Sequence, residues 1–550
     1  MKDFIGKHHR ILFFASWFLI NLVQAATTGL MDDEAYYWVY SQFSAWGYFD
    51  HPPMIAVLIK AGTSIFNGEL GVRFFIVVLN TLTLLLIYNL LRPDDRNDKL
   101  FYAICYSLML APIGGILAVP DLPLLFFAAL YFYLYKRFLE NTGLINALLL
   151  GVGIALMLYS KYHGILLVFF TLLSNLQLFK RPHTYVAAVT ALVLFYPHIS
   201  WQLNHDLPSV QYHLFERNAS SYQPGFTLEY VFGQLALAGP IAGWLLLWAA
   251  FRYKTGSQFE RTLKFNLAGI YIFFLLSTLK GRVEANWTVP AFVSLIVLSY
   301  YFLLDREKQR RWLYKMVPAT IVLVLVVRVF MAIDIERVSW ISKDEFHSNE
   351  QWVKEVNETS NGLPVVILNS YQLPSKYFFY TGEKAFGLNT AYYRRNNYNF
   401  WPLEDSLFGK RAFVMGRKDS MLFTHQFAIP VLKESGATVI DNYYSFSRIQ
   451  FVDPELRNDS LYFTARTPAG YLKLMQNRPY ADAKIQLAVI TPNVGVEYLN
   501  TGLTVMHIRK TEQQLVVPFP VNIPKDKVVK LVIESAVKGH PSLNSTAVKR

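Results

Sequence analysis

The sequence predicts a polytopic α-helical membrane protein with a soluble domain at its C-terminal end. Hydrophobic residues make up 53% of the 550 residues and charged residues only 17%, which is too apolar for a set of ordinary soluble domains. Apolar stretches close to the roughly 20 residues that a helix needs to cross a bilayer recur between residues 11 and 333. Beyond residue 333 shorter alternating runs replace them.

Hydropathy and helix-breaking residues predict about eleven membrane-spanning helices, several of them shorter than the usual length. An odd number places the two termini on opposite sides of the membrane. The first stretch, with basic residues before it and Ala25-Ala26 after it, also fits a secretory signal peptide, but we expect it to be retained as a span. The predicted spans are 11–28, 72–91, 100–118, 122–139, 144–159, 164–179, 184–200, 230–251, 265–280, 288–304 and 314–333.

Loop charges orient these spans. One set of loops holds nineteen Lys and Arg residues, and the other set holds only six. The positive-inside rule assigns the richer set to the cytoplasm, which predicts a cytoplasmic N-terminus and an extracytoplasmic C-terminal domain. The net charge of +13 therefore reflects topology, and we expect membrane lipids but no nucleic acid as partners. The six outer cations are Lys60, Arg73, Lys161, Arg217, Lys280 and Arg282.

We divide the chain into a membrane domain (1–333), an α/β domain (334–443) and a β-rich domain (444–550). Strand-like runs at 365–368, 412–416 and 438–440 alternate with helix-like stretches at 344–359 and 423–435, which indicates a small α/β layer. After residue 444, turn residues separate runs typical of strands. These runs are 446–451, 485–490, 503–508, 514–519 and 528–534. The single Cys105 excludes an intramolecular disulfide.

The predicted outer face collects the acidic residues near the membrane. Asp33 and Glu34 follow the first span, and a carboxylate held against a partly dehydrated cavity can act as a general base. A solvated acidic loop, or a helix whose first turn is acidic, explains them as well. Tyr37 belongs to an aromatic run that also fits an interfacial belt.

Several histidines lie in the same predicted loops. Asp50 and His51 precede two prolines, where an acid beside an imidazole can bind a divalent metal or hold a phosphate, or can form a turn before a helix. His205 and His213 in the stretch 198–217 join them as candidate metal ligands. No pair there has the spacing of a helical zinc site, so a metal is not demanded.

Isolated charges complete the set. Asp121 lies between two prolines in a short outer hairpin, where it either lines a cavity or closes a turn. Lys161, followed by Tyr162, stands in an otherwise uncharged run and either extends toward water or binds a phosphate. The cluster Lys280, Arg282 and Glu284 ends a span, where its cations neutralise a phosphate or anchor the helix. Together these residues indicate one outward-facing cavity for an anionic lipid.

The motifs at these residues resemble the GT-C glycosyltransferases of the dolichyl- and polyprenyl-phosphate-mannose protein mannosyltransferase superfamily, which includes the bacterial aminoarabinose transferase of lipid A. The resemblance implies a polyprenyl-phosphate sugar donor, an inverting transfer and an active site between the membrane helices and the first outer loop. The motifs are DDEAYYW (32–38), FDHPP (49–53), PDLPLLFF (120–127), SKYHG (160–164), PHISWQLNHD (197–206) and EANWTVP (284–290).

The resemblance also implies roles for residues. Asp33 matches the catalytic base, Asp121 the second acidic motif, and Lys161 the lysine that holds the donor phosphate. Asp50-His51 matches an acidic–basic pair near the donor or a metal, and the resemblance extends to Arg217 and Lys280.

The function expected from these roles is transfer of a sugar to an envelope acceptor, which is lipid A, another glycolipid, a polysaccharide or a protein. No cofactor is required, with a divalent metal as the alternative. The alternative function is a flippase or transporter of lipid-linked sugars, which would place charges through the membrane depth on both sides and leave inverted repeats in the sequence.

Overall fold

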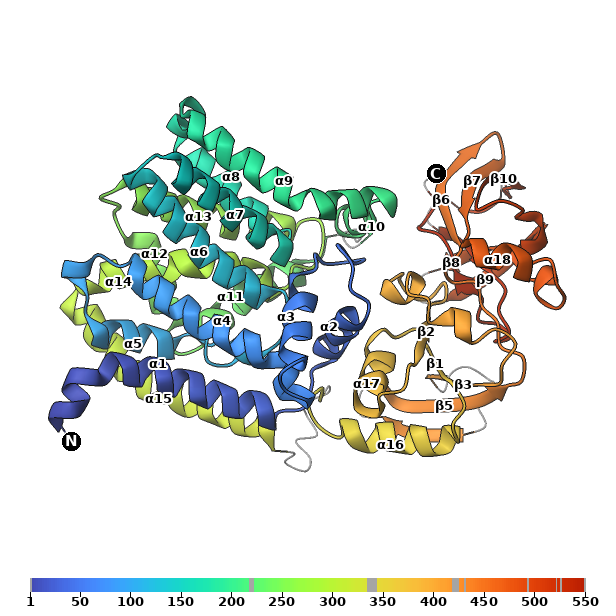
Figure 1. The fold of residues 1–550 in the computed structure, drawn as a ribbon, viewed down its shortest axis with the longest axis horizontal. Helices are drawn as coiled ribbons and strands as arrows, with labels where there is room; N and C mark the ends of the chain where they lie inside the picture. Colours follow the sequence, from blue (N-terminus) through green and yellow to red (C-terminus); the bar gives the residue numbers. More distant parts are fainter. Residues whose placement is uncertain are drawn as a thin grey trace. The chain divides into compact units, whose positions relative to one another are not determined.

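The computed structural model folds into two compact units, residues 1–338 and 339–550 (Figure 1). It describes residues 2–216, 222–333, 344–417, 425–429, 432–491, 494–520, 522–524 and 527–548.

The first unit is helical. Six of its described helices are long and apolar enough to cross a membrane, and α11 with α12 adds a candidate that is bent by 97° at a short break. Three apolar helices, α3, α7 and α8, are shorter. The main helices are α1 (Lys2–Thr27), α2 (Asp32–Gln42), α3 (Met54–Thr63), α4 (Gly68–Leu90), α5 (Asp98–Ser107), α6 (Asp121–Glu140), α7 (Leu144–Ser160), α8 (Gly164–Ser174), α9 (Pro182–Asn204), α11 (Pro224–Ala238), α12 (Gly243–Arg252), α13 (Gln258–Ser277), α14 (Phe292–Leu304) and α15 (Glu307–Ala332).

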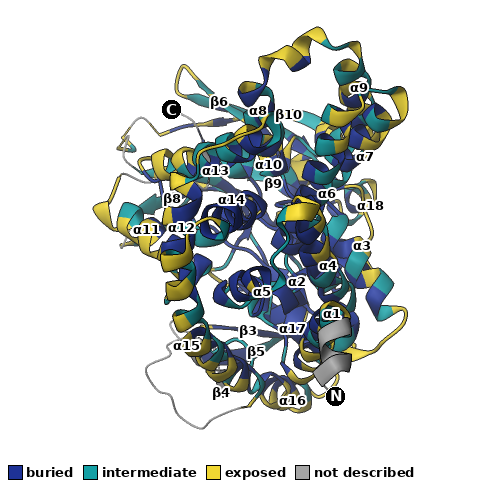
Figure 2. Ribbon diagram, turned by 90° about the vertical axis from the view of Figure 1, so that its left-hand side faces the viewer, coloured by how far each residue is buried: buried dark blue, intermediate teal, exposed yellow. Residues whose placement is uncertain are grey.

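Burial sorts these helices into a centre and a periphery. In the most apolar 18-residue stretch of segment 285–304, which contains α14, 94% of the residues are buried. In the most apolar stretches of α9 and α15 only 22% are buried. Figure 2 shows α14 in dark blue and the outer faces of α9 and α15 in yellow. Large apolar side chains such as Leu192 on α9 and Val326 on α15 are exposed. An apolar exterior around a packed centre is what a lipid solvent requires, so the first unit is a polytopic membrane domain.

The span predicted over 100–118 is interrupted. Helix α5 ends at Ser107, and turns occupy the residues up to the start of α6. Asn80 of α4 donates hydrogen bonds from its amide to the carbonyls of Ala111 (2.9 Å) and Gly115 (3.1 Å). Because non-helical carbonyls at membrane depth need partners, this amide stabilises a break that hydropathy alone does not reveal.

The second unit begins with a five-stranded sheet of order β2-β1-β3-β5-β4. Strand β1 is parallel to β2 and β3, and β5 is antiparallel to β3 and β4. Helices α16 (Asn349–Ser360) and α17 (Gln372–Thr381) pack on one face, where Trp352 and Leu373 share a core with Ile367 and Phe413. The strands are β1 (Val365–Leu368), β2 (Phe386–Leu388), β3 (Ala412–Arg417), β4 (His425–Ile429) and β5 (Leu432–Ile440).

The helix expected over 423–435 is wrong in its described part, which forms β4 and the start of β5. The physical reason is the open edge of β3, whose backbone groups need a partner, and β5 supplies it from Ala412↔Ile440 to Arg417↔Ser435.

Two antiparallel sheets follow, with orders β10-β7-β6 and β12-β11-β8-β9. They enclose one core that includes Phe451, Phe463, Leu487 and Leu531. The run 503–508 is a strand only at its start, because β9 ends at Thr504 and a 3₁₀ turn follows. The strands are β6 (Gln450–Arg457), β7 (Ser460–Arg466), β8 (Lys484–Thr491), β9 (Gly495–Thr504), β10 (Glu512–Pro518), β11 (Val528–Ile533) and β12 (Ser542–Leu543). The soluble unit is therefore β-rich after its α/β layer.

Candidate active site

Asp121, Lys161 and Asn286 come from three separate segments of the membrane domain and meet in one buried cluster. Asp121 is the first residue of α6, Lys161 directly follows α7, and Asn286 lies in the 3₁₀ segment η5 (Ala285–Ala291). The Lys161 ammonium donates to Asp121 Oδ1 at 2.8 Å, and the Asn286 amide donates to Asp121 Oδ2 at 3.0 Å. Asp121 and Lys161 are 3% and 5% exposed. A buried ion pair needs such additional hydrogen bonds to offset its loss of hydration.

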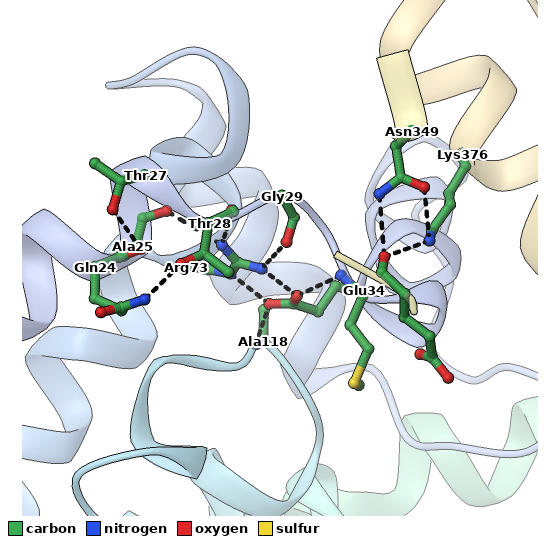
Figure 3. Close-up of polar contacts among 12 residues, drawn as sticks. Gln24, Ala25, Thr27, Thr28, Gly29, Glu34, Arg73, Ala118, Asn349 and Lys376 are labelled. Carbon is green, nitrogen blue, oxygen red and sulfur yellow. Dashed lines mark hydrogen bonds and ion pairs between the residues drawn. The ribbon is translucent and has the colours of Figure 1, made fainter. Parts of the chain in front are cut away.

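A second buried ion pair fixes the segment that carries Asp33. Arg73 of α4 donates from Nε to Glu34 Oε1 at 2.7 Å and from Nη2 to Glu34 Oε2 at 2.5 Å, and both side chains are fully buried. The remaining Arg73 donors reach the carbonyls of Ala25, Thr28 and Gly29 at the end of α1 (Figure 3). Arginine suits this place because its planar guanidinium offers five donors in a fixed geometry.

Glu34 also connects α2 to the segment that leads into α6. Its Oε1 accepts from the backbone N–H of Ala118 at 2.7 Å, three residues before Asp121 (Figure 3). The first turn of α2 and the approach to α6 are therefore in direct contact. Asp33 lies in that turn and is only partly buried, whereas Glu34 is buried in contacts with the protein. In this structure the Glu34 carboxylate is occupied by Arg73 and by the Ala118 N–H.

The loop between α2 and α3 packs against the segment after α10 (Pro208–Gln211). The Tyr40 hydroxyl donates to the Asp50 carboxylate. His213 Nε2 lies 2.9 Å from the Asp50 carbonyl oxygen, and the ring of His51 contacts the ring of Tyr37 with centroids 5.5 Å apart. The predicted residues Tyr37, Asp50 and His51 are thus held together by contacts within this loop and α2.

Tyr162 extends this network to α9. Its ring centroid is 6.0 Å from that of His213. Its hydroxyl lies 3.0 Å from His198 Nε2 and accepts from the Gln202 amide at 3.0 Å. Because Tyr162 directly follows Lys161, the loop network and the Asp121 cluster are neighbours along the chain.

The remaining predicted cations lie elsewhere. Lys280 and Arg282 are exposed, and Arg282 pairs with Glu229 at 3.0 Å. Glu284 directly precedes η5, two residues before Asn286. Arg217 lies outside the described residues.

The predicted metal ligands do not form a cluster. Among the residues that the structure describes, no group of three or more His, Cys, Asp and Glu could hold a metal ion. His205 stacks on Trp201 and directs Nδ1 at the Trp201 carbonyl oxygen at 2.8 Å. A ring nitrogen that faces a carbonyl carries the proton and is not a metal ligand in that state, which also applies to His213 Nε2.

Three residues of the site were not chosen from the sequence as candidates: Arg73, Asn286 and Gln202. Arg73 carried a signal, since it is the one charged residue in the apolar body of α4 after its first turn. Asn286 and Gln202 stand inside recognised motifs, but neutral amides have no pattern that marks a partner distant in the chain.

Comparisons with known proteins match parts of the chain. Residues 50–201 match the dolichyl-phosphate-mannose-protein mannosyltransferase family. The chain is 26% identical over 309 residues to the lipid A galacturonosyltransferase RgtD of Rhizobium johnstonii, and 28% identical over 322 residues to the lipopolysaccharide core galacturonosyltransferase RgtA of the same organism. These alignments cover 53% of this chain and 64% and 63% of the relatives, which is less than two thirds of their length.

A solved structure shows the same fold. The crystal structure of ArnT from Cupriavidus metallidurans bound to undecaprenyl phosphate superposes with a TM-score of 0.58 at 13% sequence identity. The match covers 78% of this chain and 98% of ArnT. The chain is therefore a polytopic helical membrane protein with the fold of ArnT, and its residues 50–201 are similar to the protein mannosyltransferase family.

Proposed function

We propose that the chain is an inverting glycosyltransferase that moves a sugar from a polyprenyl-phosphate donor to an envelope acceptor on the extracytoplasmic side of the bacterial inner membrane. The observation that carries this proposal is the buried contact of Asp121, Lys161 and Asn286, next to the segment that holds Asp33. Carboxylates and an ammonium grouped at one end of membrane helices suit the transfer chemistry of an anionic lipid.

Lys161 binds the donor phosphate in this mechanism. An ammonium has three N–H groups, and within the described part of the chain the Lys161 ammonium donates to one acceptor, Asp121 Oδ1. The other two N–H groups can reach phosphate oxygens. As the phosphate leaves the sugar its oxygens gain negative charge, so a fixed cation there stabilises the transition state more than the ground state.

Asp33 acts as the general base. Its carboxylate takes the proton of an acceptor hydroxyl or amine, and that atom forms a bond to the anomeric carbon on the face opposite the phosphate. The bond between the anomeric carbon and the phosphate oxygen breaks with its electron pair on oxygen. Polyprenyl phosphate leaves, and the configuration at the sugar is inverted.

Asp121 is a positioning residue in this scheme. Both its oxygens are occupied, by Lys161 and by Asn286, so its carboxylate holds the ammonium in place and does not need to exchange protons itself. Glu34 positions Asp33 in the same sense, through Arg73 and Ala118.

The names of the relatives favour lipid A or the lipopolysaccharide core as acceptor and galacturonic acid as the sugar. ArnT, which was solved with undecaprenyl phosphate, supports that carrier as the donor lipid. We propose a mechanism that requires no cofactor, so a chelator should leave the rate unchanged.

The test uses the purified full chain with undecaprenyl-phosphate galacturonic acid and lipid A, and mass spectrometry follows the mass gain of the acceptor. Asp33→Asn should bind the donor but lower the rate by about 10³-fold or more, since it removes the base. Glu69→Gln, which removes another carboxylate from the same end of the membrane domain, is the matched control. Wild-type turnover by Asp33→Asn would exclude Asp33 as the base.

If wild-type protein transfers nothing to lipid A, the envelope lipids of a deletion strain identify the acceptor by a missing glycosyl mass. A deletion strain with an unchanged set of envelope glycans would contradict the transferase proposal itself.

A further inference from the structure

A cation-rich pocket of about 770 Å³ lies between the end of α12 and the junction of α14 with α15. Its lining includes the aromatic side chains Trp248 and Phe302 and the cations Arg252, Lys254, Lys264 and Arg306. It has no residue in common with the Asp121 cluster.

The pocket lies at the opposite end of the membrane helices from that cluster. Asn286, which contacts Asp121, stands in η5 before α14, whereas Phe302 and Asp305 stand at the far end of α14. At 1.5 Å per residue the 13 residues of α14 alone span about 20 Å, to which η5 adds about 14 Å. The two sites are therefore separated by roughly the hydrocarbon thickness of a bilayer.

The charge of the lining is strongly positive. Asp305 is the one carboxylate beside the four cations that line this pocket. Arg252, Lys254 and Arg306 are exposed, and within the described ranges no carboxylate forms an ion pair with any of them. An anion that enters this pocket therefore meets cations that are not already neutralised.

Lys264 binds backbone carbonyls in the wall of the pocket. Its ammonium donates to the carbonyls of Ala250 (2.8 Å), Phe251 (2.5 Å) and Tyr253 (3.2 Å), which are the unpaired groups at the end of α12. These three bonds fix the wall from which Arg252 and Lys254 project. The backbone at the end of α12 is therefore held in place by a side chain of α13.

Aromatic rings also line the pocket. Trp248 packs edge-on against Phe302 with ring centroids 5.0 Å apart, and Trp248 remains 41% exposed. The Arg306 guanidinium lies 5.2 Å from the centre of the Phe302 ring. Aromatic rings beside cations suit a molecule with acyl chains below a charged group, because aromatic rings favour the level of the lipid headgroups.

We infer that this pocket binds the phosphate headgroup of an anionic phospholipid in the leaflet opposite the active site. The phosphate contacts Arg252, Lys254 and Arg306, and the acyl chains lie along Trp248 and the neighbouring rings. The cation-rich loops around the pocket make the cytoplasmic leaflet, where anionic headgroups attract such clusters, the expected side. This inference is independent of the proposed transfer reaction.

The experiment measures the thermal unfolding midpoint of the purified full chain in neutral detergent during titration with dioleoylphosphatidylglycerol. A saturable rise is expected, and Arg252→Gln combined with Arg306→Gln should weaken the apparent affinity about 20-fold, since each cation near an anionic lipid contributes several-fold. The matched control is Arg261→Gln with Lys308→Gln, which removes two charges from the first turns of α13 and α15 but none from the pocket. Lys254→Gln alone, in an exposed loop, should weaken binding about fivefold and serves if the double variant does not fold.

Two further probes identify the source of the phosphate. Dioleoylphosphatidylcholine should shift the midpoint much less than the anionic lipid, and inorganic phosphate should not shift it at the same concentration. If inorganic phosphate shifts the midpoint as much as the anionic lipid does, the pocket binds a soluble anion and the lipid proposal is wrong. If the pocket variants and the control variants lose the same affinity for the lipid, or if no saturable binding is found, the pocket is not a specific lipid site. The lipid is then attracted only by the general positive charge of this surface.

Discussion

The ion pair between Lys161 and Asp121 couples stability to activity at the scale of single residues. Removing one partner of a buried pair leaves the other charge without compensation, which typically costs about 3–5 kcal/mol. We therefore expect Lys161→Met to lower the unfolding temperature and to abolish transfer. Combining it with Asp121→Asn should recover most of the stability but none of the activity, because the uncompensated carboxylate is gone while the phosphate still lacks its cation. Thermal unfolding beside the transfer assay checks this. A double variant as unstable as Lys161→Met would contradict the pairing.

Glu404 in the soluble unit makes stability depend on pH. Burial raises the pKa of Glu404 to about 8, although the Ser447 hydroxyl and its backbone N–H, 3.1 Å from Glu404 Oε2, donate to the carboxylate and favour its ionised form. In the unfolded chain the ordinary pKa of 4.5 applies, so between pH 4.5 and 8 the folded state binds the extra proton. Stability from this group is therefore present at low pH and is lost as pH rises toward 8.

We accordingly expect Glu404→Gln to flatten the pH dependence of unfolding between pH 6 and 8, where wild type should lose a few degrees. Hydrogen exchange of the peptide that contains Ser447, in the full chain, locates the effect. Glu455→Gln removes an exposed carboxylate of the same unit and should keep the wild-type profile. Identical slopes for all three proteins would contradict a protonated Glu404.

The sequence pattern marks the charged residues of the candidate site but not their pairing. Asp121 and Lys161 are each an isolated charge among apolar residues, and the structure joins them in an ion pair. Glu34 was grouped with Asp33 by proximity in sequence, yet its partner is Arg73, 39 residues away. That pairing depends on how α2 packs on α4, which no local pattern encodes.

Among the elements, α2 depends on its attachment to α4. Arg73→Lys keeps the charge but cannot reproduce the donors that reach Glu34 and the three carbonyls at the end of α1. We expect an unfolding temperature lower by several degrees and a reduced kcat with donor affinity retained, because the turn that carries Asp33 loses its position. Arg282→Lys, in an exposed arginine–glutamate pair, is the control and should leave the unfolding temperature unchanged. Equal stability of the two variants would exclude this anchoring role.

Elements with a strong local pattern were predicted well. The run 365–368 is β1, and 344–359 contains most of α16. The failures have a common cause in tertiary contacts: β5 forms because β3 needs a partner, and the break after α5 is stabilised by Asn80. Amphipathic pattern and hydropathy depend only on the residues within one element. They contain no information about hydrogen-bonding partners that lie far away in the chain.

For the whole molecule, hydropathy predicts a polytopic membrane protein but does not predict where its helices bend or break. The bent pair α11 and α12 turns at Gly239, whose φ of +119° favours glycine and whose missing Cβ would lie 2.1 Å from the Ser107 carbonyl oxygen. A continuous apolar run from 230 to 251 does not reveal this turn. By length and composition the pair is either a broken span or a re-entrant loop.

Cysteine labelling decides both this alternative and the orientation of the molecule. Cys105 is fully buried, so wild type should not react with a membrane-impermeant maleimide and provides a clean background. Three exposed positions serve as reporters: Gln223 before α11, Thr255 after α12 and Lys538 in the soluble unit. With the positive-inside orientation, Gln223→Cys and Lys538→Cys should react in intact spheroplasts, and Thr255→Cys only after permeabilisation. Reaction of both Gln223→Cys and Thr255→Cys from outside would make α11 and α12 a re-entrant loop. The fully reversed pattern would move the Asp121 cluster to the cytoplasmic side, away from the acceptors proposed for it.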